Sequence, residues 1–194
     1  MRSLLVVSVA AGVVVASAAG CSNKTVPGPQ DAGLGFDVTE MVLLKSPVDP
    51  SIFILLSDRA GLCDLLNSGY GLNNLKESNT FLLNLVNIAS AVPTFGPLDA
   101  GTYPMVVDTT QSRIGFNAVG LVDFVDVGCN PTQIPATGGA VYVDALNINA
   151  GGYASGTYDV LFNLQRIQGS FDAGYCEYQL DAGVVLPDGG FVCY

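Results

Sequence analysis

The stretch S-G-T-Y-D-V-L-F-N-L-Q-R-I-Q-G-S-F-D-A-G-Y-C, residues 155–176, decides the fold of this chain. Apolar and polar side chains alternate along it, so it has an inward set and an outward set. The inward set is Tyr158, Val160, Phe162, Leu164, Ile167, Gly169 and Phe171, and the outward set is Thr157, Asp159, Asn163, Gln165, Gln168, Ser170 and Asp172. A period of two is typical of strands that are buried on one face. The stretch therefore predicts two consecutive antiparallel strands of a meander.

Short apolar runs separated by turn residues continue this pattern in the rest of the chain. The further strand candidates are residues 36–44, 51–56, 80–88, 103–108, 113–119, 121–127, 140–148, 177–180, 184–186 and 191–194. Their spacing is typical of an all-β domain. One helix is predicted near residues 59–68, with Asp58 as its N-cap and Gly69 at its end. We therefore expect a mainly β fold, an antiparallel β-sandwich or flattened barrel with this one short helix.

Composition sets the size of the molecule and excludes several classes of function. The chain has 194 residues, 49% of them hydrophobic, and 17 acidic residues oppose 7 basic ones for a formal charge of -10. This length suits one domain, and the acid excess argues against nucleic acid as a partner. The sequence contains no histidine. A Ser–His or Cys–His catalytic pair and a histidine-ligated metal site are therefore excluded, and no cofactor is predicted.

The N-terminus is typical of an export signal that ends at a cysteine. Arg2 precedes an almost wholly apolar run, residues 4–19, which is too short and too rich in Ala and Gly for a good membrane span. The segment Ala18-Ala19-Gly20-Cys21 resembles the lipobox of bacterial lipoproteins. The resemblance implies cleavage before Cys21 and lipidation of its thiol, although Ala18 stands where that family usually has Leu. The alternative is an ordinary secretory signal cut near Ala19 or Gly20.

These features divide the chain into three parts. Residues 1–20 are the predicted signal peptide, residues 21–35 a lipidated tether containing Pro and Gly, and residues 36–194 a single β-rich globular domain. Ser22 follows the lipidated cysteine, and a residue other than Asp at that place favours the outer membrane. The predicted location is therefore the cell envelope, with the domain held at the outer membrane by its N-terminal lipid.

Several segments of the mature chain extend the likeness beyond the lipobox. They are RAGLC at 59–63, GTYP at 101–104, the Thr- and Gly-rich run 129–143 that begins with a cysteine, SGTYDVLF at 155–162 and GSFDAGYC at 169–176. With these segments the chain resembles a group of uncharacterised lipoproteins of myxobacteria-like bacteria. The resemblance covers most of the mature chain, and it implies a fold and a location but no activity.

The cysteines predict two disulfides. Lipidation uses Cys21 and leaves Cys63, Cys129, Cys176 and Cys193, an even number in an exported chain. Zinc is the competing interpretation, but the cysteines are widely spaced and no C-x₂-C occurs. Of the three pairings we favour Cys176–Cys193, which would fasten the chain end, together with Cys63–Cys129, which would join the helix to the sheet.

The aspartates offer two further hypotheses. D-A-G at 31–33, 99–101, 172–174 and 181–183, and D-G-G at 188–190, are natural turns. The alternative for these turns is a calcium site built from Asp172, Asp181 and Asp188. Paired carboxylates could also serve a glycosidase. Asp123 and Asp126 are three residues apart and fall on opposite faces of a strand. A pair between strands, such as Asp159 with Asp172, stays open as the alternative, and both acids lie on the predicted solvent face.

Aromatic and basic side chains remain as candidates for binding. Six tyrosines lie in the last third of the chain: Tyr142, Tyr153, Tyr158, Tyr175, Tyr178 and Tyr194. They could line a binding face, or they could form the rim of the core. Arg113 and Arg166 are scarce positive charges, for which we expect surface ion pairs.

The function that the sequence favours is a non-catalytic envelope lipoprotein, a binding or structural module displayed from the outer membrane. Its expected partners are the membrane, through the lipid, and an unidentified extracellular or periplasmic ligand. Two alternatives stay open. One is a glycosidase-like hydrolase that relies on carboxylates, and the other is a lipocalin-like carrier, which needs an empty apolar interior.

Overall fold

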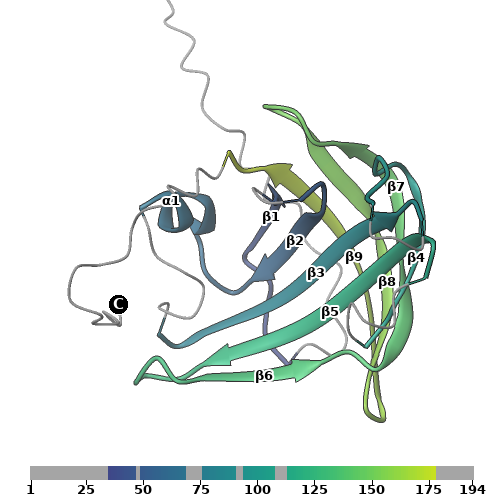
Figure 1. Ribbon diagram of the computed structural model, residues 1–194. Helices are drawn as coiled ribbons and strands as arrows, with labels where there is room; N and C mark the ends of the chain where they lie inside the picture. The colour runs from purple at the N-terminus through teal and green to yellow at the C-terminus, as the bar shows by residue number, and fades with distance from the viewer. Residues whose placement is uncertain (1–34, 47–48, 69–75, 91–93, 108–112, 178–194) are drawn as a thin grey trace, which may run out of the picture.

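A nine-stranded mixed sheet curls into a half-barrel and carries one short helix (Figure 1). This computed structural model describes residues 35–46, 49–68, 76–90, 94–107 and 113–177. The strands are β1 Glu40–Lys45, β2 Ile52–Ser57, β3 Ser78–Ile88, β4 Gly101–Pro104, β5 Gly115–Val125, β6 Pro131–Pro135, β7 Gly138–Asn147, β8 Tyr153–Phe162 and β9 Gln165–Tyr175, and the helix is α1 Leu62–Asn67. The prediction of a mainly β fold with one short helix is confirmed.

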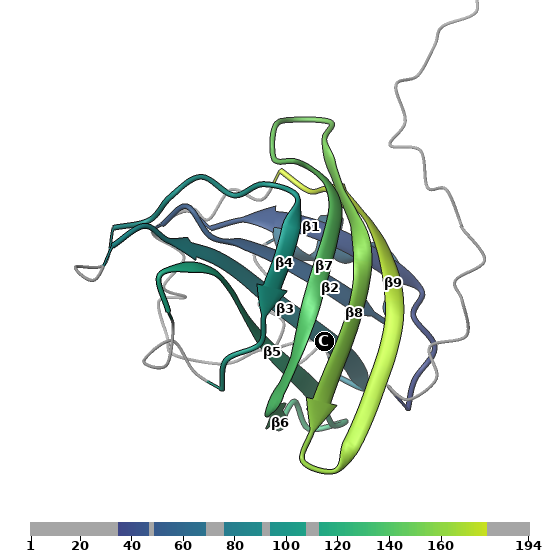
Figure 2. The same cartoon turned by 90° about the vertical axis from the view of Figure 1, so that its right-hand side faces the viewer.

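The strand order joins two antiparallel halves through one parallel contact. The order is β4-β7-β8-β9-β1-β2-β3-β5-β6, and every neighbouring pair is antiparallel except β1 with β9. In that parallel contact Val42 pairs with Gly174 and Leu43 with Tyr175. The half made of β4, β7, β8 and β9 faces the viewer in Figure 2, with the β1–β2–β3–β5 half behind it. The sequence pattern predicted an antiparallel fold and missed this parallel junction.

The two ends of the sheet meet along a seam. Beyond β4, Met105 forms a parallel bridge with Ala118 of β5, and its N–H donates to the carbonyl of Gly139 at 2.9 Å. Gly120 lies on this seam, where an added Cβ would stand 3.0 Å from the Cβ of Ala136. We predicted a break between strands 113–119 and 121–127, and the structure corrects this, because β5 runs through Gly120 without interruption. Because Gly120 has no side chain, β5 can pack closely against Ala136 at this point.

Side chains from both halves fill the interior of the half-barrel. Phe81 of β3 meets Tyr158 of β8 edge-on, with ring centroids 5.1 Å apart, and meets Phe162 in the same way at 5.8 Å. The same buried cluster includes Leu43, Ile54, Leu56, Leu83, Leu85, Tyr103, Val141, Val160, Ile167 and Phe171. This cluster is the main hydrophobic core of the described residues, and it connects the two halves of the sheet.

The meander predicted from residues 155–176 is present as β8 and β9. Tyr158, Val160, Phe162, Ile167 and Phe171 are buried, as the alternation predicts. The prediction for one inward residue is wrong, because Leu164 is 100% exposed. Residues 163 and 164 form the turn between the strands, in which Asn163 has a φ of 53°. The turn ends the alternation before it reaches Leu164.

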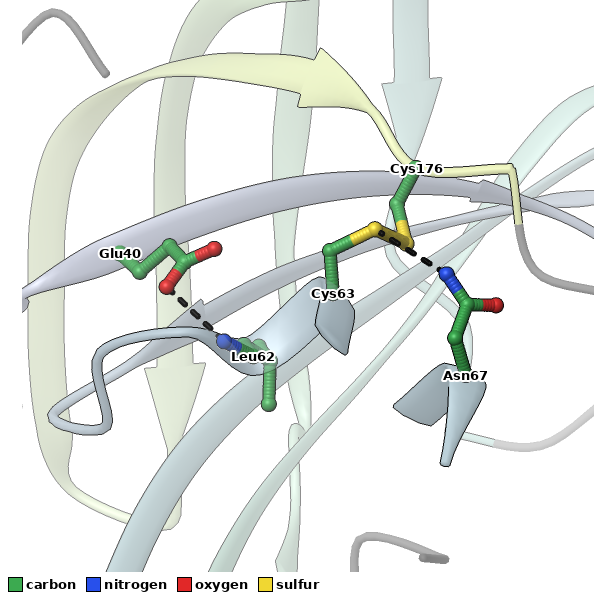
Figure 3. Close-up of a disulfide and its surroundings, with 5 residues drawn as sticks. All are labelled: Glu40, Leu62, Cys63, Asn67 and Cys176. Carbon is green, nitrogen blue, oxygen red and sulfur yellow. Dashed lines mark hydrogen bonds between the residues drawn. A yellow bond between two sulfur atoms is a disulfide. The ribbon is translucent and has the colours of Figure 1, made fainter. Parts of the chain in front are cut away.

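Helix α1 packs on the outer face of β1 and β2. Its buried Leu62 and Leu66 contact a second apolar cluster, whose other members are Val42, Leu44, Leu55 and Cys176. The N–H of Leu62 donates to a carboxylate oxygen of Glu40 at 2.9 Å (Figure 3). Gly61 is the N-cap residue, so the prediction of Asp58 in that role is wrong. Asp58 instead accepts a hydrogen bond from the backbone N–H of Asn79.

A disulfide between Cys63 of α1 and Cys176 closes this side of the molecule (Figure 3). The predicted pairs Cys176–Cys193 and Cys63–Cys129 are therefore wrong. The parallel contact explains the error, because it carries the end of β9 to β1, where the N–H of Cys176 donates to Leu43 at 2.8 Å. The Cα atoms of the pair then lie 5.6 Å apart, within the ordinary range. Cys129, in the β5–β6 turn, is disulfide-bonded to a cysteine outside the described residues.

Candidate functional site

The outer surface of β7, β8 and β9 combines exposed tyrosines with polar side chains. Its members are Tyr142, Tyr153, Ser155, Thr157, Asp159, Arg166, Gln168, Ser170 and Asp172, and we call this set the tyrosine face. The strands that bear these residues face the viewer in Figure 2. All of these residues occupy the strand positions between the buried ones, so the alternation that builds the core also builds this face.

Two aromatic rings stand open to solvent on this face. Tyr142 is 43% exposed and Tyr153 is 47% exposed. Tyr142 pairs with Thr157, which pairs in turn with Ser170, so a ring and two hydroxyl groups form one row across three strands. Tyr153 lies four residues before Thr157 on β8, a distance of about 13 Å at the usual rise of a strand.

The neighbour of Tyr153 on β9 is a glycine. Gly174 pairs with Tyr153, and an added Cβ at Gly174 would meet nothing within 4 Å. No side chain of that pair therefore covers the ring from β9. The space beside Tyr153 is open, and a ligand lying along β8 could reach the ring there.

An ion pair orders the other end of the tyrosine face. The Nε of Arg166 donates to Oδ1 of Asp159 at 2.6 Å, and a terminal nitrogen of Arg166 donates to Oδ2. This bidentate hydrogen bond lowers the pKa of Asp159 and raises the pKa of Arg166. A smaller electrostatic effect of Tyr142 also raises the pKa of Arg166. The surface ion pair that we expected for Arg166 is present. Arg113 bonds Asn117 through its backbone N–H and carbonyl.

The structure does not bring Asp159 and Asp172 together as a carboxylate pair. Asp159 pairs with Gln168, and Asp172 pairs with Ser155, so four residues of strand separate the two acids. That spacing places them about 13 Å apart along the strands, beyond the separation of about 5–9.5 Å that glycosidases use. The hydrolase hypothesis gains no carboxylate dyad here.

The second carboxylate pair is divided between a strand and a turn. Asp123 is buried on β5, whereas Asp126 follows the strand and is exposed. Asp126 accepts hydrogen bonds from the N–H of Gly128 and from the N–H and side chain of Asn130, and these contacts, the side chain first, lower its pKa. Asp126 therefore serves the turn.

Asp123 belongs to a polar row that sequence reasoning missed, and the members of this row other than the exposed Gln133 are buried. The row runs across the outer surface of four strands as Ser57, Thr80, Asp123 and Gln133. The hydroxyl of Thr80 donates to that of Ser57 at 3.2 Å. Asp123 is only 5% exposed, and its Oδ1 has no hydrogen-bond partner within the described residues. Burial raises the pKa of Asp123, and a hydrogen bond from Gln133 opposes this effect.

Replacing Asp123 by Asn is expected to stabilise the protein by about 1 kcal/mol near pH 7, because the variant removes a buried charge with an unpaired oxygen. The raised pKa means that the folded chain holds the proton more tightly than the unfolded chain. Stability therefore falls as the pH rises from the ordinary value of 3.8 through the folded pKa. The advantage of Asp123→Asn should be complete above this window and absent below it.

Urea unfolding near pH 7 and near pH 3 measures this difference. The matched control is Asp172→Asn, because Asp172 is exposed on β9, and its stability should equal that of the parent at both pH values. A loss of stability for Asp123→Asn near pH 7 would show that the folded protein favours the charged carboxylate.

The remaining predicted site residues are dispersed or lie outside the described part of the chain. Tyr158 is a core residue that contacts Phe81, and Tyr175 is half-buried. Of the three aspartates in the calcium hypothesis, the structure describes Asp172, which lies on β9. Residues that fall outside the described ranges are Cys21, Tyr178, Asp181, Asp188, Cys193 and Tyr194. Within the described ranges, no group of three or more potential metal ligands occurs.

Two further findings concern the chain as a whole. In the part of the chain that the structure describes, no helix has the length and apolar character to cross a membrane. Comparisons with protein-family models, with curated proteins and with solved structures give no match to this chain.

Proposed function

We propose that this protein is a non-catalytic lipoprotein of the bacterial outer membrane that presents the tyrosine face as a binding surface. The observation that carries the proposal is the exposure of Tyr142 and Tyr153 among mainly polar side chains, on a face that also exposes Leu161. Tyrosines pair a flat apolar ring with a hydroxyl group, and they are enriched where proteins bind their partners.

The pairing of the other cysteines bears directly on the proposed lipidation of Cys21. Cys63 bonds Cys176, and Cys129 is bonded to a cysteine outside the described residues, which leaves Cys21 and Cys193 as the candidates. If Cys193 is that partner, then Cys21 is the one unpaired thiol of the chain, as a lipobox cysteine must be. If Cys21 is the partner, its thiol is not available to a lipid.

Replacing Cys21 by Ala is expected to move the protein from the membrane fraction to the soluble fraction, because two or three acyl chains provide durable anchoring and the variant has none. The measurement is fractionation of cells that express the full chain, followed by intact mass of the membrane-bound protein. The control is Ser22→Ala, which should remain in the membrane fraction.

Two results would contradict the lipid anchor. One is unchanged membrane fractionation of Cys21→Ala. The other is a Cys21–Cys129 linked peptide in a non-reducing digest of the mature protein, because a thiol in a disulfide cannot carry a lipid.

A further inference from the structure

We propose that the tyrosine face binds a neutral glycan chain that lies along β8, an inference that deepens the proposed function and rests on it. The two exposed rings stand about 13 Å apart along the strand. Ser155 lies between these two levels on the outer face of β8, and Thr157 lies beside Tyr142. The face therefore presents one ring at the start of β8 and a second ring level with its middle, with the hydroxyl group of Ser155 between them and those of Thr157 and Ser170 beside Tyr142.

The chemistry of the side chains suits a ligand with many hydroxyl groups. A tyrosine ring can stack on the C–H face of a sugar, and its hydroxyl group can donate or accept a hydrogen bond. Thr157 and Ser170 offer hydroxyl groups that donate and accept, Gln168 offers an amide, and Asp172 offers a carboxylate that accepts. A large apolar partner would leave these polar groups without hydrogen bonds, at a cost in binding free energy.

The negative charge of the protein favours a neutral ligand over an anionic one. Arg166 is the one basic residue in β4, β7, β8 and β9, and both oxygens of Asp159 already engage it. Asp144 and Asp172 are exposed on the same strands, and the whole chain carries a formal charge of -10. This field disfavours anionic ligands such as nucleic acid or an acidic polysaccharide. A neutral glycan meets no such repulsion.

The open space at Gly174 provides a direct way to test the site. Because an added Cβ there would meet nothing within 4 Å, Gly174→Val should fold normally while it places a side chain beside the ring of Tyr153. The variant removes no existing contact. Loss of binding in Gly174→Val would therefore report on access to the face.

The experiment is affinity electrophoresis of the full lipidated chain in detergent, through gels that contain dextran, a mixed-linkage β-glucan or a galactomannan, with carboxymethyl-dextran as the anionic counterpart. We expect at least one neutral glycan to retard the protein. Tyr142→Ala, Tyr153→Ala and Gly174→Val should each weaken that retardation about tenfold, the size of effect found for central interface residues. Tyr153→Phe should keep much of the binding, because it keeps the ring.

The matched control is Phe95→Ala. Phe95 is also an exposed aromatic residue, at 42%, but it lies beside Ile88 at the end of β3 and not on the tyrosine face. Removing its ring should therefore leave the retardation unchanged. Unchanged thermal unfolding of the variants checks their folding.

Retardation by none of the neutral glycans, or retardation that Tyr142→Ala and Tyr153→Ala leave intact, overturns the glycan site. Stronger retardation by carboxymethyl-dextran also overturns it, as does binding of the face to a protein alone. None of these results affects the fractionation of Cys21→Ala, so failure of the glycan site remains distinguishable from failure of the lipid anchor.

Discussion

Replacing Phe81 by Ala should lower the free energy of unfolding by about 3–5 kcal/mol, the usual cost of deleting a buried phenylalanine ring. Phe81 is fully buried on β3 and touches Tyr158 and Phe162 of β8 edge-on. These contacts join the two halves of the half-barrel, because β3 belongs to one half and β8 to the other. The substitution therefore removes packing from both halves at once and leaves a cavity between them.

Urea unfolding of the parent and of Phe81→Ala measures this loss. Phe95→Ala makes the same chemical change at an exposed position and should alter stability by no more than about 0.5 kcal/mol. Phe81→Leu should recover part of the loss, since it refills some of the cavity. If Phe81→Ala costs as little as the control, the halves do not pack against each other as described.

The success of the local predictions has a simple physical cause. Alternation within residues 155–176 depends only on which side of a pleated strand is buried, so it predicts the inward positions of β8 and β9 without reference to the strands that pair with them. The prediction failed at Leu164, where the chain leaves the strand for a turn. A turn of two residues is as long as one period of the alternation, so the pattern continues through the turn and does not reveal it.

The parallel contact between β1 and β9 could not be predicted in the same way. Leu43 and Tyr175 are paired, yet 132 positions of sequence separate them, counted from their residue numbers. Nothing in either strand specifies the other. The disulfide depends on this contact, so an argument from nearness along the chain selected Cys176–Cys193 and missed Cys63–Cys176.

The candidate site was predictable only in part. Alternation placed Thr157, Asp159 and Gln168 outward, and the structure agrees. The open rings of Tyr142 and Tyr153 required knowledge of their neighbours, above all of Gly174. The burial of Asp123 was also hidden, because a strand pattern shows which residues share a face but not whether that face is covered.

Removing the Cys63–Cys176 disulfide should lower the free energy of unfolding by about 3–5 kcal/mol. The two cysteines are 113 residues apart, and the loss of entropy that a bridge imposes on the unfolded chain grows with loop length, to about 4.7 kcal/mol for a loop of about 100 residues. The bridge also holds α1, which has only six residues and is too short to be stable alone. Its loss should therefore expose the apolar cluster beneath the helix.

The double variant Cys63→Ala and Cys176→Ala tests this expectation better than a reducing agent, because a reductant would also act on the disulfide of Cys129. Alanine keeps the surroundings of the buried Cys176 apolar. Urea unfolding should show the loss, and hydrogen exchange at α1 should rise more than exchange at β8, which belongs to the other cluster. Leu62→Ala is the matched comparison: it weakens the packing of the helix but leaves the unfolded chain cross-linked. If the double variant keeps the stability of the parent while Leu62→Ala loses stability, the packing of the helix stabilises the fold and the bridge does not.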